Sequence, residues 1–186
     1  MMSEEVLDDR QRTALLRIAR STIERIVGAT SRDDQEDGSG DRPDVKAGAF
    51  VSLHKRGQLR GCIGTFDTTQ PVVQQVEEMA EAAATRDPRF RPVVESELGD
   101  LDIEISVLTP PRPIEDPEEI LVGTHGLVIS QGFRRGVLLP QVATEYGWDR
   151  ETFLRHTCRK AGLSDDAWKD PQTTIQVFTA EVFGER

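Results

Sequence analysis

The stretch GAFVSLHKRGQLRGCIG, residues 48–64, limits most narrowly how this chain can fold. Two short strand-like runs flank Arg56 and Gly57. Gly57 can adopt the positive φ that a two-residue hairpin turn requires. We therefore expect an antiparallel hairpin with Arg56 and Gly57 as its turn.

The turn also predicts a register for this hairpin. Side chains alternate between the two faces of a strand, so Arg60 and Cys62 should lie on one face, and Leu59, Gly61 and Ile63 on the other. The expected cross-strand pairs are His54 with Leu59, Leu53 with Arg60, and Val51 with Cys62.

Other segments have helical patterns. Apolar side chains at three- and four-residue spacing predict an amphipathic helix over roughly residues 8–27. A second apolar stripe starts at Pro71, which suits the beginning of a helix, and ends at RDPRFRP, residues 86–92, where two prolines prevent continuation. Two later helices are expected at residues 141–146 and 149–161.

Strand patterns lie between these helices. LDIEISVL, residues 101–108, alternates between apolar and polar side chains and predicts a strand with one polar face. GLVIS and GVLLP flank QGFRR as a second hairpin, TPPRPIEDPEE is expected to be extended, and TTIQVFTAEVF closes the chain as a strand. Helices and hairpins are interspersed without regular βαβ alternation. This order predicts an α+β fold with a largely antiparallel sheet and helices packed on it.

Residues 28–45 interrupt this pattern with Gly, Ser, Asp and Pro and almost no apolar side chains. Such a segment cannot bury enough surface to offset the cost of ordering it, so we expect a flexible acidic linker or loop. The helix in residues 1–27 is then part of the same domain as residues 46–186.

The formal net charge of -10 disfavours direct nucleic-acid binding and contact with an anionic membrane surface. No apolar run approaches the ~18 residues of a membrane span, and the acidic N-terminus lacks the apolar region of a signal peptide. We therefore expect a cytoplasmic protein in which Cys62 and Cys158 are thiols.

From Gly48 to Phe183 the chain carries, in order, GAFVSL, LRGCIG, DPRF, IEISVLTPP, GLVIS, RRGVLLPQVA, a GW before a helix, and AGL before WKDP. This order resembles the AMMECR domain family. The resemblance implies two α+β subdomains with a cleft between them that LRGCIG, residues 59–64, lines. It also implies association with a Memo-type or a radical-SAM protein, and it implies no particular reaction. The acidic segment before Val45 departs from the family pattern as an insertion.

Cys62 is the first candidate for chemistry. Its thiolate could act as a nucleophile if Arg60 and the loop arginines supply a positive field. The alternative is a small apolar residue packed in a strand. Gly61 and Gly64 would let a ligand approach the strand backbone, or they make room for a closely crossing helix.

Arg60 and Arg89 are candidate anchors for an anionic ligand, because a guanidinium recognises carboxylate or phosphate at two points. Glu104 could serve as a base or hold an arginine in place, and Gln141 could face the same cleft. The alternative is an internal salt-bridge network. In either case Arg60, Arg89 and Glu104 should lie near one another.

His54, His125 and His156 do not combine with the two cysteines in any standard zinc-binding spacing. We therefore expect no metal site and no cofactor. Two functions stay open. The chain could be an enzyme-like domain that acts on a small or base-like anionic substrate, with Cys62 as the reactive group. Otherwise it is a non-catalytic module that presents the same cleft to a protein partner.

Overall fold

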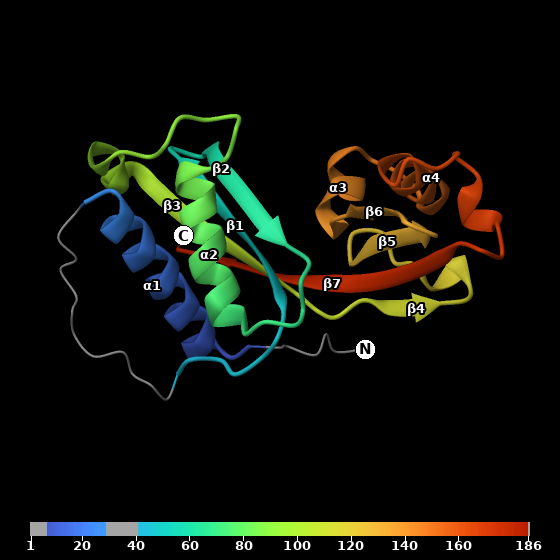
Figure 1. Ribbon diagram of the computed structural model, residues 1–186, viewed down its shortest axis with the longest axis horizontal. Coiled ribbons are helices and arrows are strands. Elements are labelled where there is room, and N and C mark those ends of the chain that lie inside the picture. Colours follow the sequence, from blue (N-terminus) through green and yellow to red (C-terminus); the bar gives the residue numbers. More distant parts are fainter. Residues whose placement is uncertain (1–6, 29–40, 186) are drawn as a thin grey trace. The chain divides into compact units, whose positions relative to one another are not determined.

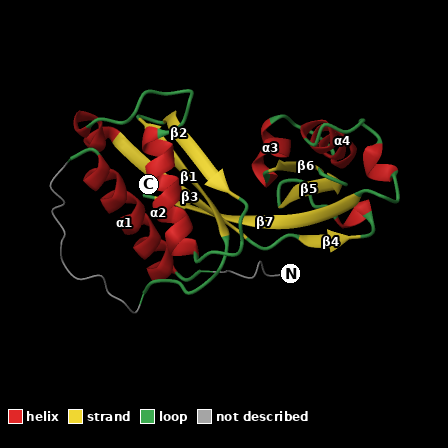
Figure 2. Cartoon of the chain, viewed as in Figure 1, coloured by secondary structure: helices red, strands yellow, loops and turns green. Residues whose placement is uncertain are grey.

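The computed structural model describes residues 7–28 and 41–185. The chain divides into two compact units, one formed by residues 1–108 and 181–186 and the other by residues 109–180. Strands pair antiparallel in both units and helices pack on them, which confirms the predicted α+β fold (Figure 2). Most of the predicted linker, residues 29–40, lies outside the described residues.

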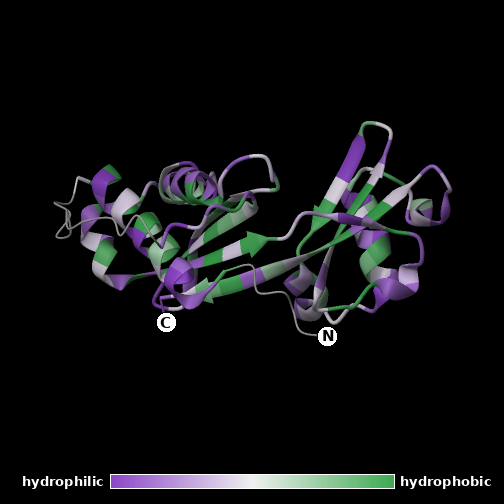
Figure 3. Cartoon of the chain, turned by 90° about the horizontal axis from the view of Figure 1, so that it is seen from below, coloured by the Kyte–Doolittle hydropathy of each residue, from purple (hydrophilic) through white to green (hydrophobic). Residues whose placement is uncertain are grey.

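In the described part of the first unit, antiparallel strands follow one another in the order β2-β1-β3 (Figure 1). They are β1 (Gly48–Lys55), β2 (Gln58–Thr65) and β3 (Leu101–Leu108). β2 is therefore the terminal strand of this order. Figure 3 shows apolar and polar residues along the strands. In β3 buried and half-buried positions alternate from residue 101 to residue 105, as the sequence pattern predicted, but Ser106 of the predicted polar face is buried.

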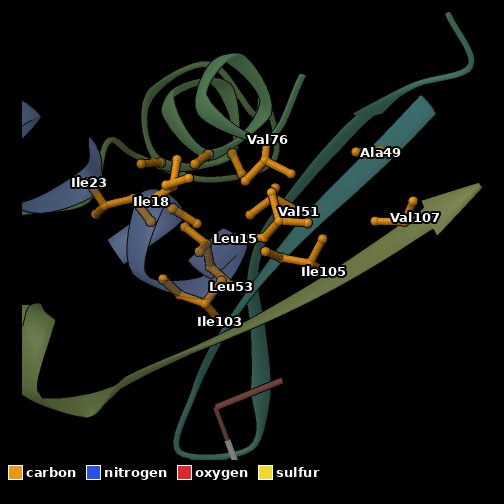
Figure 4. Packing of buried hydrophobic residues seen from close by; sticks show 14 of the residues in the cluster. Leu15, Ile18, Ile23, Ala49, Val51, Leu53, Val76, Ile103, Ile105 and Val107 are labelled. Carbon is orange, nitrogen blue, oxygen red and sulfur yellow. The ribbon is translucent and has the colours of Figure 1, made fainter. Parts of the chain in front are cut away.

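Two helices pack on one face of these strands, α1 (Asp9–Ile26) and α2 (Val72–Thr85). Asp8 begins α1 with a capping box, because its carboxylate accepts the Gln11 N–H at 2.8 Å and its own N–H donates to the Gln11 side chain. Figure 4 shows apolar side chains of both helices meeting those of the strands. Burial of each such side chain contributes roughly 1.5–3 kcal/mol. The buried cluster includes Leu15, Ile18, Ile23, Val51, Leu53, Val76, Ile103 and Ile105.

The hairpin turn lies where the sequence placed it. Arg56 and Gly57 both have positive φ, 51° and 78°, as a two-residue hairpin turn of the I′ type requires. His54 lies opposite Leu59. This first cross-strand pair is confirmed.

Beyond that pair the predicted register is wrong by one residue. Cys62 lies opposite Ser52 rather than Val51, and Gly61 rather than Arg60 lies opposite Leu53. Arg60 is the additional residue of a β-bulge. A bulge inserts one residue into one strand only, so every later pair is displaced.

The second unit contains four strands. β5 (His125–Gln131) pairs with β6 (Arg134–Leu138) and β7 (Thr174–Gly184), and β4 (Arg112–Ile114) pairs with β7. β4 lies in the segment that was predicted to be extended, and its pairing with β7 makes it a short strand. The last residues of β7 belong to the first unit, where Glu185 N–H donates to the Ile103 carbonyl at 3.1 Å.

Two helices cover this second group of strands, α3 (Pro140–Glu145) and α4 (Arg150–Lys160). The Asp149 carboxylate accepts the Thr152 N–H at 2.8 Å and caps α4, at the residue where the predicted helix begins. A Cβ on Gly136 of β6 would come closer than 3.0 Å to the backbone of α4, so this glycine permits the crossing. Short 3₁₀ helices occur at Glu95–Asp100, Pro117–Glu119 and Ala167–Lys169.

Among residues 7–28 and 41–185, none of the helices combines the length and the apolar character that a bilayer span needs.

Candidate functional site

Three side chains with polar or ionisable groups form a row across the strands of the first unit. Ser52 of β1 lies directly opposite Cys62 of β2 on one side and Glu104 of β3 on the other. Directly opposed residues share a face of the sheet, and their neighbours Val51 and Ile105 point the other way, into the core below α1 and α2. The row therefore lies on the face turned away from these helices.

The thiol of Cys62 is half-buried and lies close to a hydroxyl group. The Ser52 hydroxyl oxygen is 3.2 Å from the Cys62 sulfur. Sulfur accepts hydrogen bonds weakly as a thiol, and a negative charge on the sulfur strengthens the bond. Ser52 is thus placed to stabilise a thiolate.

The peptide groups of Cys62 bond to side chains of the loop that follows α2. Its N–H donates to the Asp87 carboxylate at 2.9 Å, and its carbonyl accepts from Arg89 Nη2 at 3.2 Å. Both groups thus point away from β1, which makes Cys62 and Ser52 a non-hydrogen-bonded pair. Side chains lie closer in such pairs, which explains the short Cys62–Ser52 distance.

Asp87 and Arg89 also bind each other at two points. Arg89 Nε donates to Oδ1 at 2.9 Å and Arg89 Nη2 donates to Oδ2 at 2.7 Å. The Asp87 side chain is only 2% exposed, whereas that of Arg89 is 54% exposed. The hydrogen bond from Arg89 holds the pKa of Asp87 well below its ordinary value despite burial, with a further contribution from the Cys62 N–H.

The pKa of Arg89 is raised, mainly by its hydrogen bond to Asp87. Burial opposes this change, and the charges of Asp87 and of Cys62 add to it. Arg89 is therefore held by hydrogen bonds to both the Asp87 carboxylate and the Cys62 peptide.

Arg60 has a similar two-point partner in Glu97. Its Nε donates to Oε1 at 3.1 Å and its Nη2 to Oε2 at 2.9 Å, and both side chains are 14% exposed. Lys55 Nζ lies 2.8 Å from the same carboxylate. The hydrogen bond from Arg60, then that from Lys55, outweigh burial and lower the pKa of Glu97 to about 2.

Phe90 links the two arginine pairs. The guanidinium carbons of Arg60 and Arg89 lie 5.9 and 5.5 Å from the centre of its ring. Arg60 and Arg89 are thus near each other, as expected. Their acidic partners are Glu97 and Asp87, however, and not Glu104.

The two glycines of LRGCIG face protein atoms. A Cβ on Gly61 would come closer than 3.0 Å to the Ala83 carbonyl at the end of α2, and a Cβ on Gly64 would meet the Phe50 ring as closely. Gly61 therefore permits a close helix crossing, and Gly64 makes room for an aromatic ring. A ligand-binding role of either glycine stays a prediction.

The remaining candidate, Gln141, lies at the start of α3 in the second unit, where its carbonyl accepts the Thr144 hydroxyl at 2.8 Å. It is therefore not part of the row in the first unit. Its contribution to a ligand site also stays a prediction.

One histidine, His54, belongs to the first unit, and the other two belong to the second unit. His54 is on β1, His125 Nδ1 accepts the Leu121 N–H at 3.2 Å, and the His156 ring stacks on Trp148 at 3.8 Å. Burial is the main cause of the lowered pKa of His125. In the described ranges, 7–28 and 41–185, no group of three or more His, Cys, Asp or Glu side chains could hold a metal ion.

Both cysteines are free thiols. Cys158 is fully buried in the core of the second unit, and this burial raises its pKa. It is therefore a packing residue.

Sequence reasoning did not identify Ser52, Asp87 or Glu97. Asp87 stands in the DPRF motif beside Arg89, so the motif itself could have drawn attention to it. Ser52 and Glu97 offer no such signal, because the bulge and the 3₁₀ helix that place them are not evident in the pattern.

The AMMECR1 family model matches residues 16–183. A protein from Methanothermobacter thermautotrophicus is 47% identical over 180 residues, which covers 92% of each chain. A protein from Thermococcus gammatolerans is 45% identical over 181 residues, which covers 92% of this chain and 88% of the relative.

A solved structure is similar as well. The crystal structure of the uncharacterized protein PH0010 from Pyrococcus horikoshii has a TM-score of 0.81 and 40% sequence identity to this chain. The match covers 97% of this chain and 94% of that one.

Proposed function

The chain belongs to the AMMECR1 family, and we propose that it binds a small anionic ligand beside the LRGCIG strand, with the Cys62 thiol as the reactive group. One observation carries this proposal. The half-buried Cys62 sulfur is 3.2 Å from the Ser52 hydroxyl, on the sheet face turned away from the helices, and the half-exposed Arg89 guanidinium bonds to the Cys62 peptide.

In this proposal Cys62 is the nucleophile, since the thiolate is the reactive form of a cysteine. Ser52 donates a hydrogen bond to the sulfur. Glu104, two strands away in the same row, is the base or the group that orients a ligand. Ser52 lies directly opposite both Cys62 and Glu104, so the three side chains share one face of the sheet. This arrangement supports the assignment.

Arg89 supports the preference for an anion. Its contacts with Asp87 use Nε and Nη2, and 54% of the side chain is exposed, so a ligand can reach it while the pair stays intact. Arg60 is 14% exposed and paired with Glu97. It is therefore better suited to fixing β2 at the edge of the sheet than to contacting a ligand. A direct role of Arg60 toward the ligand stays a prediction, as does the cleft.

Alkylation of the native protein tests the reactive thiol. Iodoacetamide should label Cys62 in native buffer and leave Cys158 unlabelled until unfolding, as mass spectrometry of the peptides would show. Cys158 is an internal control, because it is fully buried. Protection of Cys62 until unfolding would exclude its role as nucleophile.

A charged reagent tests the preference for anions. Iodoacetate and iodoacetamide differ by one negative charge, so the ratio of their rates at Cys62 reports the local potential. The ratio of the iodoacetate rate to the iodoacetamide rate should be higher at Cys62 than at a free thiol, and Arg89→Ala should lower this ratio. A ratio equal to that of a free thiol in the unmodified protein would contradict an anionic ligand.

A second function is a protein-interaction module, in which Cys62 is a packing residue. Exposed apolar side chains of the second unit favour it, since Leu121 is 53% and Tyr146 69% exposed. Gly123 lies beside Thr144 of α3, so the segment that carries Leu121 is a neighbour of the segment that carries Tyr146. Leu121 and Tyr146 define this surface. The family resemblance suggests a Memo-type or a radical-SAM protein as the partner.

A pull-down with a purified Memo-type or radical-SAM protein distinguishes the two functions. For a module, binding should survive Cys62→Ala and weaken with Tyr146→Ala. Retention of binding by both variants would exclude this surface as the interface.

A further inference from the structure

We infer that Asp87 and Arg89 are positioning residues, which hold the peptide of Cys62 in place and bring a positive charge to its thiol. This inference rests on the proposed function of Cys62 as the reactive group. It assigns a role to Asp87, which the sequence did not single out, and a second role to Arg89, in addition to the expected one of anchoring a ligand.

The first argument is the position of β2 in the sheet. Among the strands of residues 7–28 and 41–185, β2 is the terminal one of the order β2-β1-β3, so none of them lies beside the outward N–H and C=O groups of Cys62. The Asp87 carboxylate accepts the N–H, and the Arg89 guanidinium donates to the C=O. Together the two side chains replace a neighbouring strand at this one residue.

The second argument is rigidity. The Asp87 carboxylate accepts hydrogen bonds from the Cys62 N–H, the Arg89 N–H and the Arg89 guanidinium. With 2% exposure, Asp87 is too buried to meet a ligand itself. It can therefore influence a reaction only through Cys62 and Arg89.

The third argument is electrostatic. Arg89 Nη2 donates to the carbonyl of Cys62 itself, so the guanidinium charge lies next to the residue that carries the thiol. A cation close to a cysteine favours its thiolate over the neutral form. Asp87 holds the guanidinium in this place through two hydrogen bonds.

Hydrogen exchange of backbone amides tests the positioning without reference to reactivity. In Asp87→Ala the Cys62 amide should exchange at least tenfold faster than in the unmodified protein, because its acceptor is gone. The amide of Ile63, which faces β1 in the ladder, should be unchanged. An unchanged Cys62 amide in a folded Asp87→Ala variant would overturn the inference.

The pH profile of Cys62 alkylation tests the electrostatic part. Arg89→Gln should slow alkylation at neutral pH about threefold or more and move the profile to higher pH, because a nearby cation favours the thiolate. Arg89→Lys should restore part of the rate. Arg86→Gln is the matched control, since Arg86 lies in the same loop, is exposed and pairs with Glu81.

These outcomes separate the two proposals. A purely structural role of Arg89 would loosen the loop and speed alkylation at every pH without moving the profile, and this result would overturn the inference. If the unmodified protein does not react at Cys62, the proposed function fails, while the exchange of the Cys62 amide still decides whether Asp87 positions it. If Cys62 reacts and Arg89→Gln changes nothing, only the inference fails.

Discussion

The sulfur of Cys62 and the hydroxyl oxygen of Ser52 are 3.2 Å apart, across two strands, and the peptide groups of Cys62 point away from the strand that carries Ser52. The predicted register would have placed Val51 there, with an apolar side chain opposite the thiol. The β-bulge at Arg60 brings a hydrogen-bond donor to the sulfur instead.

Ser52→Ala should slow the alkylation of Cys62 at neutral pH, because the thiolate loses a hydrogen-bond donor. A reduction of about threefold to tenfold corresponds to one hydrogen bond of roughly 1 kcal/mol. Ser52→Thr keeps a hydroxyl in a residue that suits a strand and should restore most of the rate. Equal rates for the alanine and threonine variants would show that the hydroxyl does not act on the sulfur.

Gly61→Val should destabilise the protein by about 2 kcal/mol or more, because its side chain would displace the backbone at the end of α2. Urea denaturation measures this loss. Gly99→Ala is the control, since nothing lies within 4 Å of a Cβ there and its φ is not positive. Comparable stability of Gly61→Val and the native protein would contradict the close helix crossing.

Glu97 should make stability depend on acid pH. Its pKa is about 2 in the folded protein, below the ordinary value, so its contribution is present above the unfolded-state pKa of about 4.3 and is lost as the pH falls toward 2. Glu97→Gln should cost roughly 2–3 kcal/mol at pH 7 and progressively less below about pH 4. Urea denaturation at several pH values tests this, and a cost that does not change with pH would contradict it.

Asp149→Ala should destabilise the second unit by about 1 kcal/mol, because α4 loses the side chain that caps its N-terminus. Asp149→Ser keeps a capping oxygen and should recover most of the loss. Thermal unfolding followed by circular dichroism compares the three proteins. If serine and alanine are equally unstable, the cap does not contribute.

The helices and the turn of the first hairpin were predictable because local physics controls them. The Asp8 and Asp149 side chains cap helices by accepting backbone N–H groups three residues further along the chain, and Gly57 itself adopts the positive φ of the turn. Each of these interactions is contained within a few residues of sequence.

The candidate site was predictable only in part. Cys62, Arg60 and Arg89 stand in recognisable motifs, and the two arginines do lie beside the same ring, that of Phe90. Their acidic partners could not be chosen from the sequence, because Glu97 is 37 residues from Arg60 and many carboxylates compete for each arginine.

The amino-acid sequence by itself determined the order of helices and hairpins, the α+β class and the motifs that contain Cys62, Arg60 and Arg89, since periodicity, turns and motifs are local properties. Only the tertiary structure decided that Ser52 faces the thiol, that α2 and Phe50 fill the space beside Gly61 and Gly64, and that Asp87 and Glu97 hold the arginines. The reason is physical. A single bulge changes every later pair of a hairpin, and ion pairs form between whichever charges the chain path brings within hydrogen-bonding distance.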